Sequence, residues 1–453
     1  MSLPVTVAFA TLGCRLNQVE SQEMGALLES RGFRTVDAAE PAQVYVVNTC
    51  TVTGRADFSD RQLIRRLTRQ NPEALLVVTG CYAQTDAQAV ARIPGVDLVI
   101  GNQEKYRLPD LLVDLVKRSR HQMQGPEGRL PRPEIRVGDI GLATGVPVAP
   151  FSKVTGRSRA FVKIQDGCQH RCAFCIVPAA RGGSRSQEPK VVLDQIRRLV
   201  DAGYYDITLT GVDIGHWGWD LFPRRQLANL VREAAEVPAL RWLRLSSVLP
   251  AYFTPELIDA VTRSPAVAPH LHLPLQSGSD QVLRLMRRPY NVAMYRRLVE
   301  KLAGGIPELG LGADIIVGHP GERDEDFDAT MALVAELPFS YLHVFSYSDR
   351  KGTEAARLPD HASAAAIRQR SARLRSLGRE KNLAFRRRMI GQRRDVVVLA
   401  ERERETGRRL GLTGNYVEVV FDGPKELARR IVTVTVRDAS AERTLASLEE
   451  AAA

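Results

Sequence analysis

Three closely spaced cysteines constrain this chain more than any other feature. Cys168, Cys172 and Cys175 form a C-x3-C-x2-C run directly after an apolar, strand-like segment at 160–164. Thiolates this close along a chain converge on a single metal centre. A tetrahedral zinc ion would need a fourth ligand, which His170 could supply, whereas a [4Fe–4S] cluster held by three cysteines leaves one iron for a non-protein ligand. The run alone leaves both readings open.

Residues 1–120 alternate between short apolar runs and helical patterns. The runs at 5–10, 44–47 and 75–79 predict buried strands. One helix is expected to be capped by Asn17, with Glu20 at its third position and Gly32 at its end, and a basic helix is expected over 57–70. Apolar strands that alternate with helices predict a doubly wound parallel sheet.

The remaining cysteines, Cys14, Cys50 and Cys81, each follow one of these three strands. Ligands of open α/β sheets bind at the carboxyl ends of the strands, so cysteines far apart in sequence can meet there. A single cysteine at such a place is more often a small core residue. Three at equivalent strand ends predict a second site.

The rest of the chain divides into four segments. Residues 121–157 are rich in glycine and proline and predict a linker without regular structure. Strands expected at 160–165, 206–212, 241–247, 270–275, 312–318 and 341–347 predict an open barrel of six βα units over 158–388, with its active site at the carboxyl ends of the strands. Short β runs predict a small antiparallel barrel over 389–440, and 441–453 is expected to be a frayed tail.

Composition narrows the class of protein. The chain has 453 residues, 6 cysteines and a net charge of +11. It has no stretch of about twenty apolar residues and no basic signal-like start, so we expect no membrane association and a cytoplasmic location. The positive charge is consistent with a polyanionic partner. The alternative is that the abundance of arginine reflects only the base composition of the genome.

Several motifs resemble those of the methylthiotransferases, a radical S-adenosylmethionine (SAM) family. They are TLGCRLNQVE at 11–20, VNTCTVT at 47–53, TGCYAQ at 79–84, IQDGC at 164–168, CIVPAARG at 175–182, LSS at 245–247, LPLQSGSD at 273–280 and DIIVGHPGE at 314–322. The resemblance covers nearly the whole chain. It implies a cluster domain, a radical-SAM barrel and a C-terminal TRAM-like barrel that binds RNA.

The resemblance also implies cofactors and a substrate. Cys168, Cys172 and Cys175 would hold a [4Fe–4S] cluster whose open iron binds SAM as the radical source, and Cys14, Cys50 and Cys81 would hold an auxiliary [4Fe–4S] cluster that carries sulfur. SAM would also donate the methyl group. The residues around Cys14 look most like the branch that methylthiolates C2 of N6-threonylcarbamoyladenosine at position 37 of tRNA. The alternatives are N6-isopentenyladenosine, a ribosomal-protein aspartate, or a non-catalytic RNA-binding protein with a metal site.

Further residues and partners follow from the resemblance. SAM is expected to contact the residues after the first, second and fourth barrel strands, namely Phe174, Thr210, Gly211, Asp213, Gln276 and Ser277. His319 is not expected to be a catalytic base. The expected partners are the anticodon stem-loop of tRNA, a low-potential electron donor such as flavodoxin or ferredoxin, and a sulfur donor. RNA is expected to contact Arg393, Arg394, Arg408 and Arg409, and the helix with Arg61, Arg65, Arg66 and Arg69 could form an opposite wall.

Overall fold

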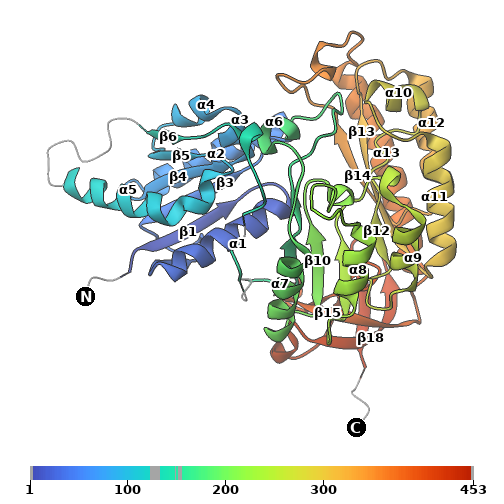
Figure 1. Ribbon diagram of the computed structural model, residues 1–453. Helices are drawn as coiled ribbons and strands as arrows, with labels where there is room; N and C mark the ends of the chain where they lie inside the picture. The colour runs from blue at the N-terminus through green and yellow to red at the C-terminus, as the bar shows by residue number, and fades with distance from the viewer. Residues whose placement is uncertain (1–3, 123–132, 148, 152–155, 450–453) are drawn as a thin grey trace.

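The computed structural model describes residues 4–122, 133–147, 149–151 and 156–449. Figure 1 shows an N-terminal α/β unit beside an open barrel, with a small C-terminal barrel below the latter. This arrangement confirms the predicted fold class.

The N-terminal unit is a parallel sheet with helices on both faces. Within the described residues the strand order is β2-β1-β3-β4-β5-β6. One face packs on α1 and α5 through residues such as Met24 and Leu112, and the other packs on α2 through Ile64 and Leu67. The elements are β1 Thr6–Thr11, α1 Arg15–Ser30, β2 Arg34–Val36, β3 Val44–Thr49, α2 Gly54–Gln70, β4 Leu75–Gly80, α3 Cys81–Thr85, α4 Ala87–Ala91, β5 Leu98–Ile100, α5 Leu108–Gln122 and β6 Glu134–Arg136.

Both predicted helix starts were wrong by a few residues. Helix α1 begins at Arg15 with Cys14 at its cap, so Asn17 lies inside the first turn and does not cap it. The Asn17 amide instead donates to the carbonyls of Leu12 and Thr49, because the strand ends leave those acceptors unpaired. Helix α2 begins at Gly54, where the side chain of Thr53 accepts from the amide of Ala56.

The segment predicted as a structureless linker contains a strand. β6 pairs in parallel with β5, so the sheet continues past the expected boundary at residue 120. The periodicity of the sequence does not predict this three-residue edge strand, because the strand is stabilised by pairing with residues far away in the chain. Residues 123–132 of the expected linker lie outside the described part of the chain.

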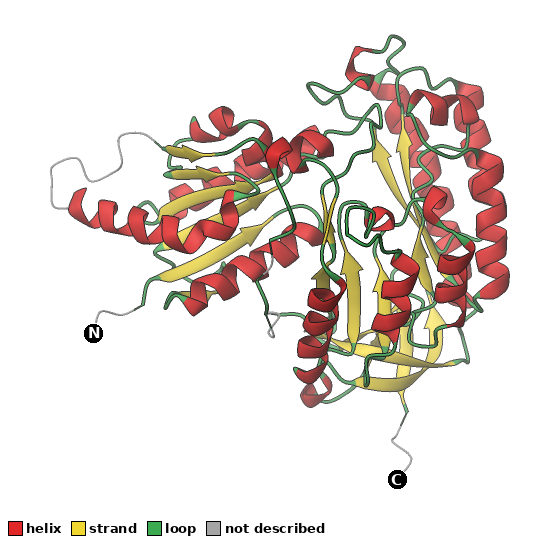
Figure 2. Ribbon diagram, in the orientation of Figure 1, coloured by secondary structure: helices red, strands yellow, loops and turns green. Residues whose placement is uncertain are grey.

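The central unit is the predicted open barrel. Two parallel sheets, β11-β10-β7 and β12-β13-β14, adjoin through a bridge between Leu243 and Val267. No pairing joins β14 to β7 in the described residues, so the barrel is open there. Figure 2 shows the helices along the outer side of these strands. The elements are β7 Ala160–Lys163, β8 Gln165–Asp166, α6 Val177–Arg181, β9 Arg185–Ser186, α7 Pro189–Asp201, β10 Asp206–Thr210, α8 Leu227–Ala235, β11 Trp242–Leu245, α9 Pro255–Arg263, β12 His270–His272, α10 Asp280–Leu285, α11 Val292–Gly305, β13 Gly310–Val317, α12 Asp324–Glu336, β14 Tyr341–Ser346 and α13 Ala364–Arg387.

Alternation along these strands separates an apolar outer face from a polar interior. Ile207, Leu243, Leu271 and Leu311 belong to the core under the helices. The alternate positions face inward, because strand side chains point to opposite faces in turn. They include Phe161, Thr208, Arg244, His272, Asp314 and His343. We call the space that they line the lumen.

The C-terminal unit is a closed barrel. Its strand order is β15-β16-β17-β19-β18, and the pairs are antiparallel except for β17 with β19. The strands are β15 Arg393–Arg402, β16 Arg409–Thr413, β17 Glu418–Phe421, β18 Ile431–Ala439 and β19 Thr444–Leu448. β19 lies in the predicted tail, so the boundary at 440 was wrong: this strand closes the barrel. Residues 450–453 of that tail are outside the described range.

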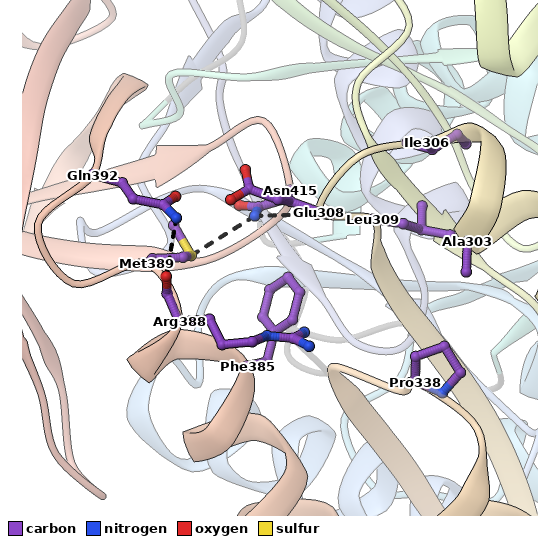
Figure 3. Close-up of a pocket in the computed structure, with 10 residues that line it drawn as sticks. All are labelled: Ala303, Ile306, Glu308, Leu309, Pro338, Phe385, Arg388, Met389, Gln392 and Asn415. Atoms are coloured by element: carbon purple, nitrogen blue, oxygen red, sulfur yellow. Dashed lines mark hydrogen bonds between the residues drawn. The ribbon is translucent and has the colours of Figure 1, made fainter.

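The turn between β16 and β17 fits against the amino ends of the central strands. Arg244 donates to the carbonyls of Gly414 and Thr413 at 2.7 and 2.9 Å. A cavity of about 370 Å³ lies beside this junction, and Figure 3 shows Asn415 reaching toward Glu308 and Met389 there. This cavity is at the end of the barrel opposite the cysteines, so it is not the predicted site.

None of the helices in the described ranges is long and apolar enough to cross a membrane.

Candidate functional site

Cys14, Cys50 and Cys81 lie at neighbouring strand ends of the N-terminal sheet. Glycines allow their loops to approach one another. A Cβ added at Gly13, which has φ +95°, would lie 2.6 Å from Cys50 Cβ, and one at Gly80, φ +96°, would lie 2.4 Å from the Thr49 carbonyl. Burial, together with the neighbouring Cys81 and Cys14, raises the pKa of the Cys50 thiol to about 12.

Cys168, Cys172 and Cys175 lie in the loop after β7 and β8. Gln165 holds this loop against the end of β10: its Oε1 accepts from the amides of Val212 and Asp213, and its Nε2 donates to the Gly167 carbonyl. Burial raises the pKa of Cys168 to about 12 and that of Cys175 to about 11. Arg288 donates to the Cys172 sulfur at 3.2 Å.

The spacing of the thiols distinguishes between the two metal groups considered above. Tetrahedral zinc with bonds of about 2.3 Å would hold its sulfurs about 3.8 Å apart. In the described residues, only His272, Asp314 and His343 place three potential ligand atoms within 4.8 Å of one another. In neither cysteine trio do all three sulfurs lie this close together, which disfavours a single zinc ion; three thiolates are the donor set of a [4Fe–4S] cluster with one open iron. His170 exchanges a hydrogen bond with Tyr252 at 2.7 Å.

Arg181 connects the two cysteine-bearing units. It ends α6 in the CIVPAARG motif, yet its Nε donates to the Cys81 sulfur at 3.3 Å. Its Nη1 and Nη2 donate to the two carboxylate oxygens of Glu20 at 2.6 and 3.1 Å, and Nη2 also reaches Asn17 at 2.7 Å. Arg181 and Glu20 are both buried. The radical-SAM loop thus reaches one thiol of the N-terminal trio.

Glu20 is the centre of a buried ionic network. Lys105 lies 2.6 Å from its carboxylate, and Lys163 of the central barrel lies 3.9 Å away. Burial would raise the pKa of Glu20, but Arg181, Lys105 and Lys163 more than offset this and hold it well below its ordinary value. The carboxylate is therefore ionised, and it fixes the N-terminal unit against the barrel.

The expected SAM contacts lie around the second cysteine trio, but their role stays a prediction. The Asp213 carboxylate lies 4.0 Å from Cys168 Sγ and accepts from Tyr252 at 3.1 Å. Thr210 ends β10 and Gly211 follows it, and a Cβ at Gly211 would lie 2.7 Å from the Gln165 carbonyl. Phe174 makes an edge contact with His319 at 6.3 Å between ring centroids.

Gln276 and Ser277 differ in what they contact. Gln276 has φ +68°, and its buried Oε1 has no hydrogen-bond partner among the described residues, which leaves an acceptor for a ligand. The Ser277 hydroxyl lies 3.3 Å from that of Thr330 on α12 and accepts from the Ser279 amide. The side chain of Ser277 is therefore engaged in holding its own loop.

The four arginines expected to contact RNA do not form one patch. Arg393 and Arg394 begin β15, whereas Arg408 and Arg409 lie beside its far end, about 30 Å away for nine residues of strand. Arg409 is only 2% exposed and donates to the Pro424 carbonyl, so its place on an RNA-binding surface was wrong. Arg409 is buried because its position on β16 faces the inside of the C-terminal barrel. Arg393 and Arg408 are exposed, and Arg394 pairs with Glu308.

The lumen contains functional candidates that the sequence reasoning missed. Asp314 accepts from His272 at 3.0 Å and His343 at 3.2 Å. Burial would raise the pKa of Asp314, but these hydrogen bonds offset it and hold the pKa well below its ordinary value. The period-two polar patterns at 270–272 and 341–343 are the signal that could have found these residues.

Comparisons with known proteins support this arrangement. Residues 6–101 match a family model described as uncharacterized protein family UPF0004, and residues 162–334 match the radical SAM superfamily. A threonylcarbamoyladenosine tRNA methylthiotransferase, MtaB, of Bacillus subtilis is 38% identical over 95% of this chain and 93% of its own. A tRNA-2-methylthio-N6-dimethylallyladenosine synthase of Mycobacterium ulcerans is 35% identical over 97% of this chain and 83% of its own.

A solved structure has the same fold over most of the chain. It is the radical SAM methyltransferase TsrM of Kitasatospora setae, with a TM-score of 0.57 and 17% identity, covering 78% of this chain and 77% of that one. Family models, relatives matched almost end to end and the cysteine geometry agree: this chain belongs to the radical-SAM tRNA methylthiotransferases, and it is an enzyme.

Proposed function

We propose that this enzyme methylthiolates C2 of N6-threonylcarbamoyladenosine at position 37, beside the anticodon of tRNA. The observation that carries the proposal is the contact of Arg181 with Cys81, which brings the radical-SAM loop to the N-terminal cysteine trio. An enzyme that generates a radical at one site and takes sulfur from another needs these sites side by side. A protein that only binds RNA does not.

The cofactors would be held by the two trios. Cys168, Cys172 and Cys175 would bind the [4Fe–4S] cluster of the radical-SAM family together with SAM, and Cys14, Cys50 and Cys81 a second cluster. When bound, these groups supply one-electron cleavage of SAM, the sulfur and the methyl group, so that the C2 hydrogen is replaced by a methylthio group.

The chain's own residues position these groups. Gln165 fixes the cysteine loop against β10, Arg288 donates to Cys172, and Arg181 donates to Cys81. Hydrogen bonds to cluster sulfurs and burial both tune a cluster's reduction potential. Gln276 Oε1 is the free acceptor that we assign to SAM or the substrate.

The reaction needs two partners besides tRNA. An electron donor of low potential, such as flavodoxin or ferredoxin, must reduce the radical-SAM cluster, and a sulfur donor must supply the second site after each turnover. We place the enzyme in the cytoplasm, where thiols stay reduced and tRNA is modified.

Mass spectrometry of tRNA nucleosides from a deletion strain tests the substrate. We expect loss of 2-methylthio-N6-threonylcarbamoyladenosine with accumulation of its unthiolated precursor. Loss of the methylthio group from N6-dimethylallyladenosine instead would assign the activity of the M. ulcerans relative. If the methylthio groups of tRNA are all retained and the ribosomal-protein aspartate is unmodified, the substrate is that aspartate.

Iron analysis and SAM cleavage test the two sites separately. Anaerobically reconstituted protein should bind about eight irons, as two cubane clusters. The variant Cys14→Ala/Cys50→Ala/Cys81→Ala should lose half of them, still cleave SAM with dithionite and form no methylthio product. Cys168→Ala/Cys172→Ala/Cys175→Ala should not cleave SAM. Stoichiometric zinc without acid-labile sulfide would refute the cluster assignment.

A further inference from the structure

Two arginines that form no ion pair with a carboxylate of the described residues meet at the bottom of the lumen. Arg15 comes from the start of α1 in the N-terminal unit, and Arg159 directly precedes β7. Both contact Tyr416, which lies between β16 and β17 of the C-terminal barrel. Arg15 Nη2 donates to the Tyr416 hydroxyl at 2.6 Å, and the guanidinium carbons of Arg15 and Arg159 lie 5.7 and 5.4 Å from its ring centroid.

A third arginine nearby has the partners that these two lack. Arg244 donates to both carboxylate oxygens of Asp206, at 2.9 and 3.0 Å. No ion pair within 4.0 Å joins Arg15 or Arg159 to a carboxylate among the described residues; Asp206 and, less strongly, Glu401 act on Arg159 only from farther away. The bottom of the lumen therefore has more positive than negative charge.

The excess of positive charge lowers the pKa values of the neighbouring Tyr416 and His270. Burial would raise the pKa of Tyr416, but Arg15, Arg159 and Arg244 lower it below its ordinary value. Burial and the same arginines hold the pKa of His270 well below its ordinary value, so its ring is neutral and adds no positive charge. Tyr416 also has φ +70°, a strained conformation for a tyrosine and one that is maintained where the surroundings require it.

The site is accessible from the lumen. Arg15, Arg159 and Tyr416 are all half-buried, and Cys14, next to Arg15 in the chain, is exposed. A base held in the lumen near the N-terminal trio can thus extend a substituent toward the arginines. A dimethylallyl group there would desolvate two charges without compensation, whereas a carboxylate would pair with both.

We propose that Arg15, Arg159 and the Tyr416 hydroxyl bind the carboxylate of the threonylcarbamoyl group and select this base over uncharged ones. The inference rests on the proposed function for the identity of its ligand. The site combines all three units, because each contributes one of these side chains.

Binding of three anticodon stem-loop RNAs to the reconstituted full-length enzyme tests the assignment. The RNAs carry at position 37 the threonylcarbamoyl acid, its methyl ester or plain adenosine, and salt is held constant because phosphate contacts depend on it. The wild type should bind the acid about tenfold to a hundredfold more tightly than the ester, the range of a charge-assisted hydrogen bond. Arg159→Gln should abolish this preference and leave binding of the ester unchanged.

Two further variants keep the test independent of folding defects. Arg15→Gln should behave like Arg159→Gln with unchanged iron content, and Arg197→Gln, an exposed arginine on α7, should keep the wild-type preference. A wild type that binds acid and ester equally overturns the inference. So does an equal loss of affinity for all three RNAs in Arg159→Gln, because that result means a backbone phosphate contact.

Product analysis separates this inference from the proposed function. If the wild type methylthiolates the acid RNA without preferring it over the ester, the carboxylate site is wrong and the proposed function stands. If it methylthiolates only an RNA carrying N6-dimethylallyladenosine, the proposed substrate is wrong and the inference falls with it.

Discussion

The ion pair between Glu20 and Arg181 joins the N-terminal unit to the central barrel. Glu20 belongs to the N-terminal motif and Arg181 to the radical-SAM motif. Both are buried, and their hydrogen bonds extend to Asn17 and Cys81. A buried ion pair adds little stability compared with apolar side chains, but removing one partner leaves a charge that water cannot reach.

Glu20→Gln should therefore destabilise the protein strongly. It leaves Lys105 buried without its carboxylate and Arg181 with Asp166 alone, at a cost of about 3–5 kcal/mol. Urea unfolding of the apoprotein, followed by circular dichroism, measures the effect. Glu29→Gln, on an exposed position of the same helix, is the control and should shift the midpoint little. Equal midpoints for both variants would contradict a structural role of this network.

Motifs predicted the cysteine sites at the residue scale, but they could not predict the partners of those cysteines. Cys14, Cys50 and Cys81 each follow an apolar run, so their convergence follows from the geometry of a parallel sheet. Arg15, Arg159 and Tyr416 meet from three separate units, and no local pattern connects them. Arg409 shows the converse error: an arginine counted as surface is buried inside its barrel.

Elements were predictable where periodicity is local. The strands of the central barrel lie where their apolar runs predicted them. β6 was missed because it is short and gains its stability from non-local pairing with β5. β19 forms a hairpin with the neighbouring β18 and was missed because the segment after 440 was predicted to be a tail. The start of α1 was misplaced because Asn17, a strong capping residue, is used to pair strand-end carbonyls.

The turn between β16 and β17 is the element that couples the C-terminal barrel to the lumen, and Gly310 tests its fit. A Cβ at Gly310 would lie 2.1 Å from the Asn415 carbonyl, so Gly310→Ala must displace the turn. We expect a loss of about 1–3 kcal/mol in unfolding free energy. Gly304→Ala is the matched control: its Cβ would meet nothing within 4 Å on helix α11, and it should be neutral or slightly stabilising. Equal stability of the two variants would mean that the turn is not packed there.

At the scale of the whole molecule, the C-terminal barrel has two roles to distinguish. One is the RNA contact expected from the sequence, and the other is the contribution of Tyr416 to the lumen. Deleting residues 391–453 would remove both, and it would uncover Arg244, which donates to Gly414. Weaker tRNA binding by that truncation would therefore not show that the C-terminal barrel contacts RNA, and its SAM cleavage would not be a neutral control.

Surface variants separate the two roles. Arg393 and Arg408 are exposed at opposite ends of the barrel and do not touch the lumen. If both contact phosphates, Arg393→Gln/Arg408→Gln should weaken tRNA binding and reduce the slope of log affinity against log salt by about 1.4, since each phosphate contact contributes about 0.7 on single strands. SAM cleavage and the preference for the threonylcarbamoyl acid over its ester should stay unchanged. The control Arg232→Gln/Arg296→Gln removes two half-buried arginines from α8 and α11 and should leave the slope unaltered. A double variant with the wild-type slope would mean that the C-terminal barrel serves the lumen alone.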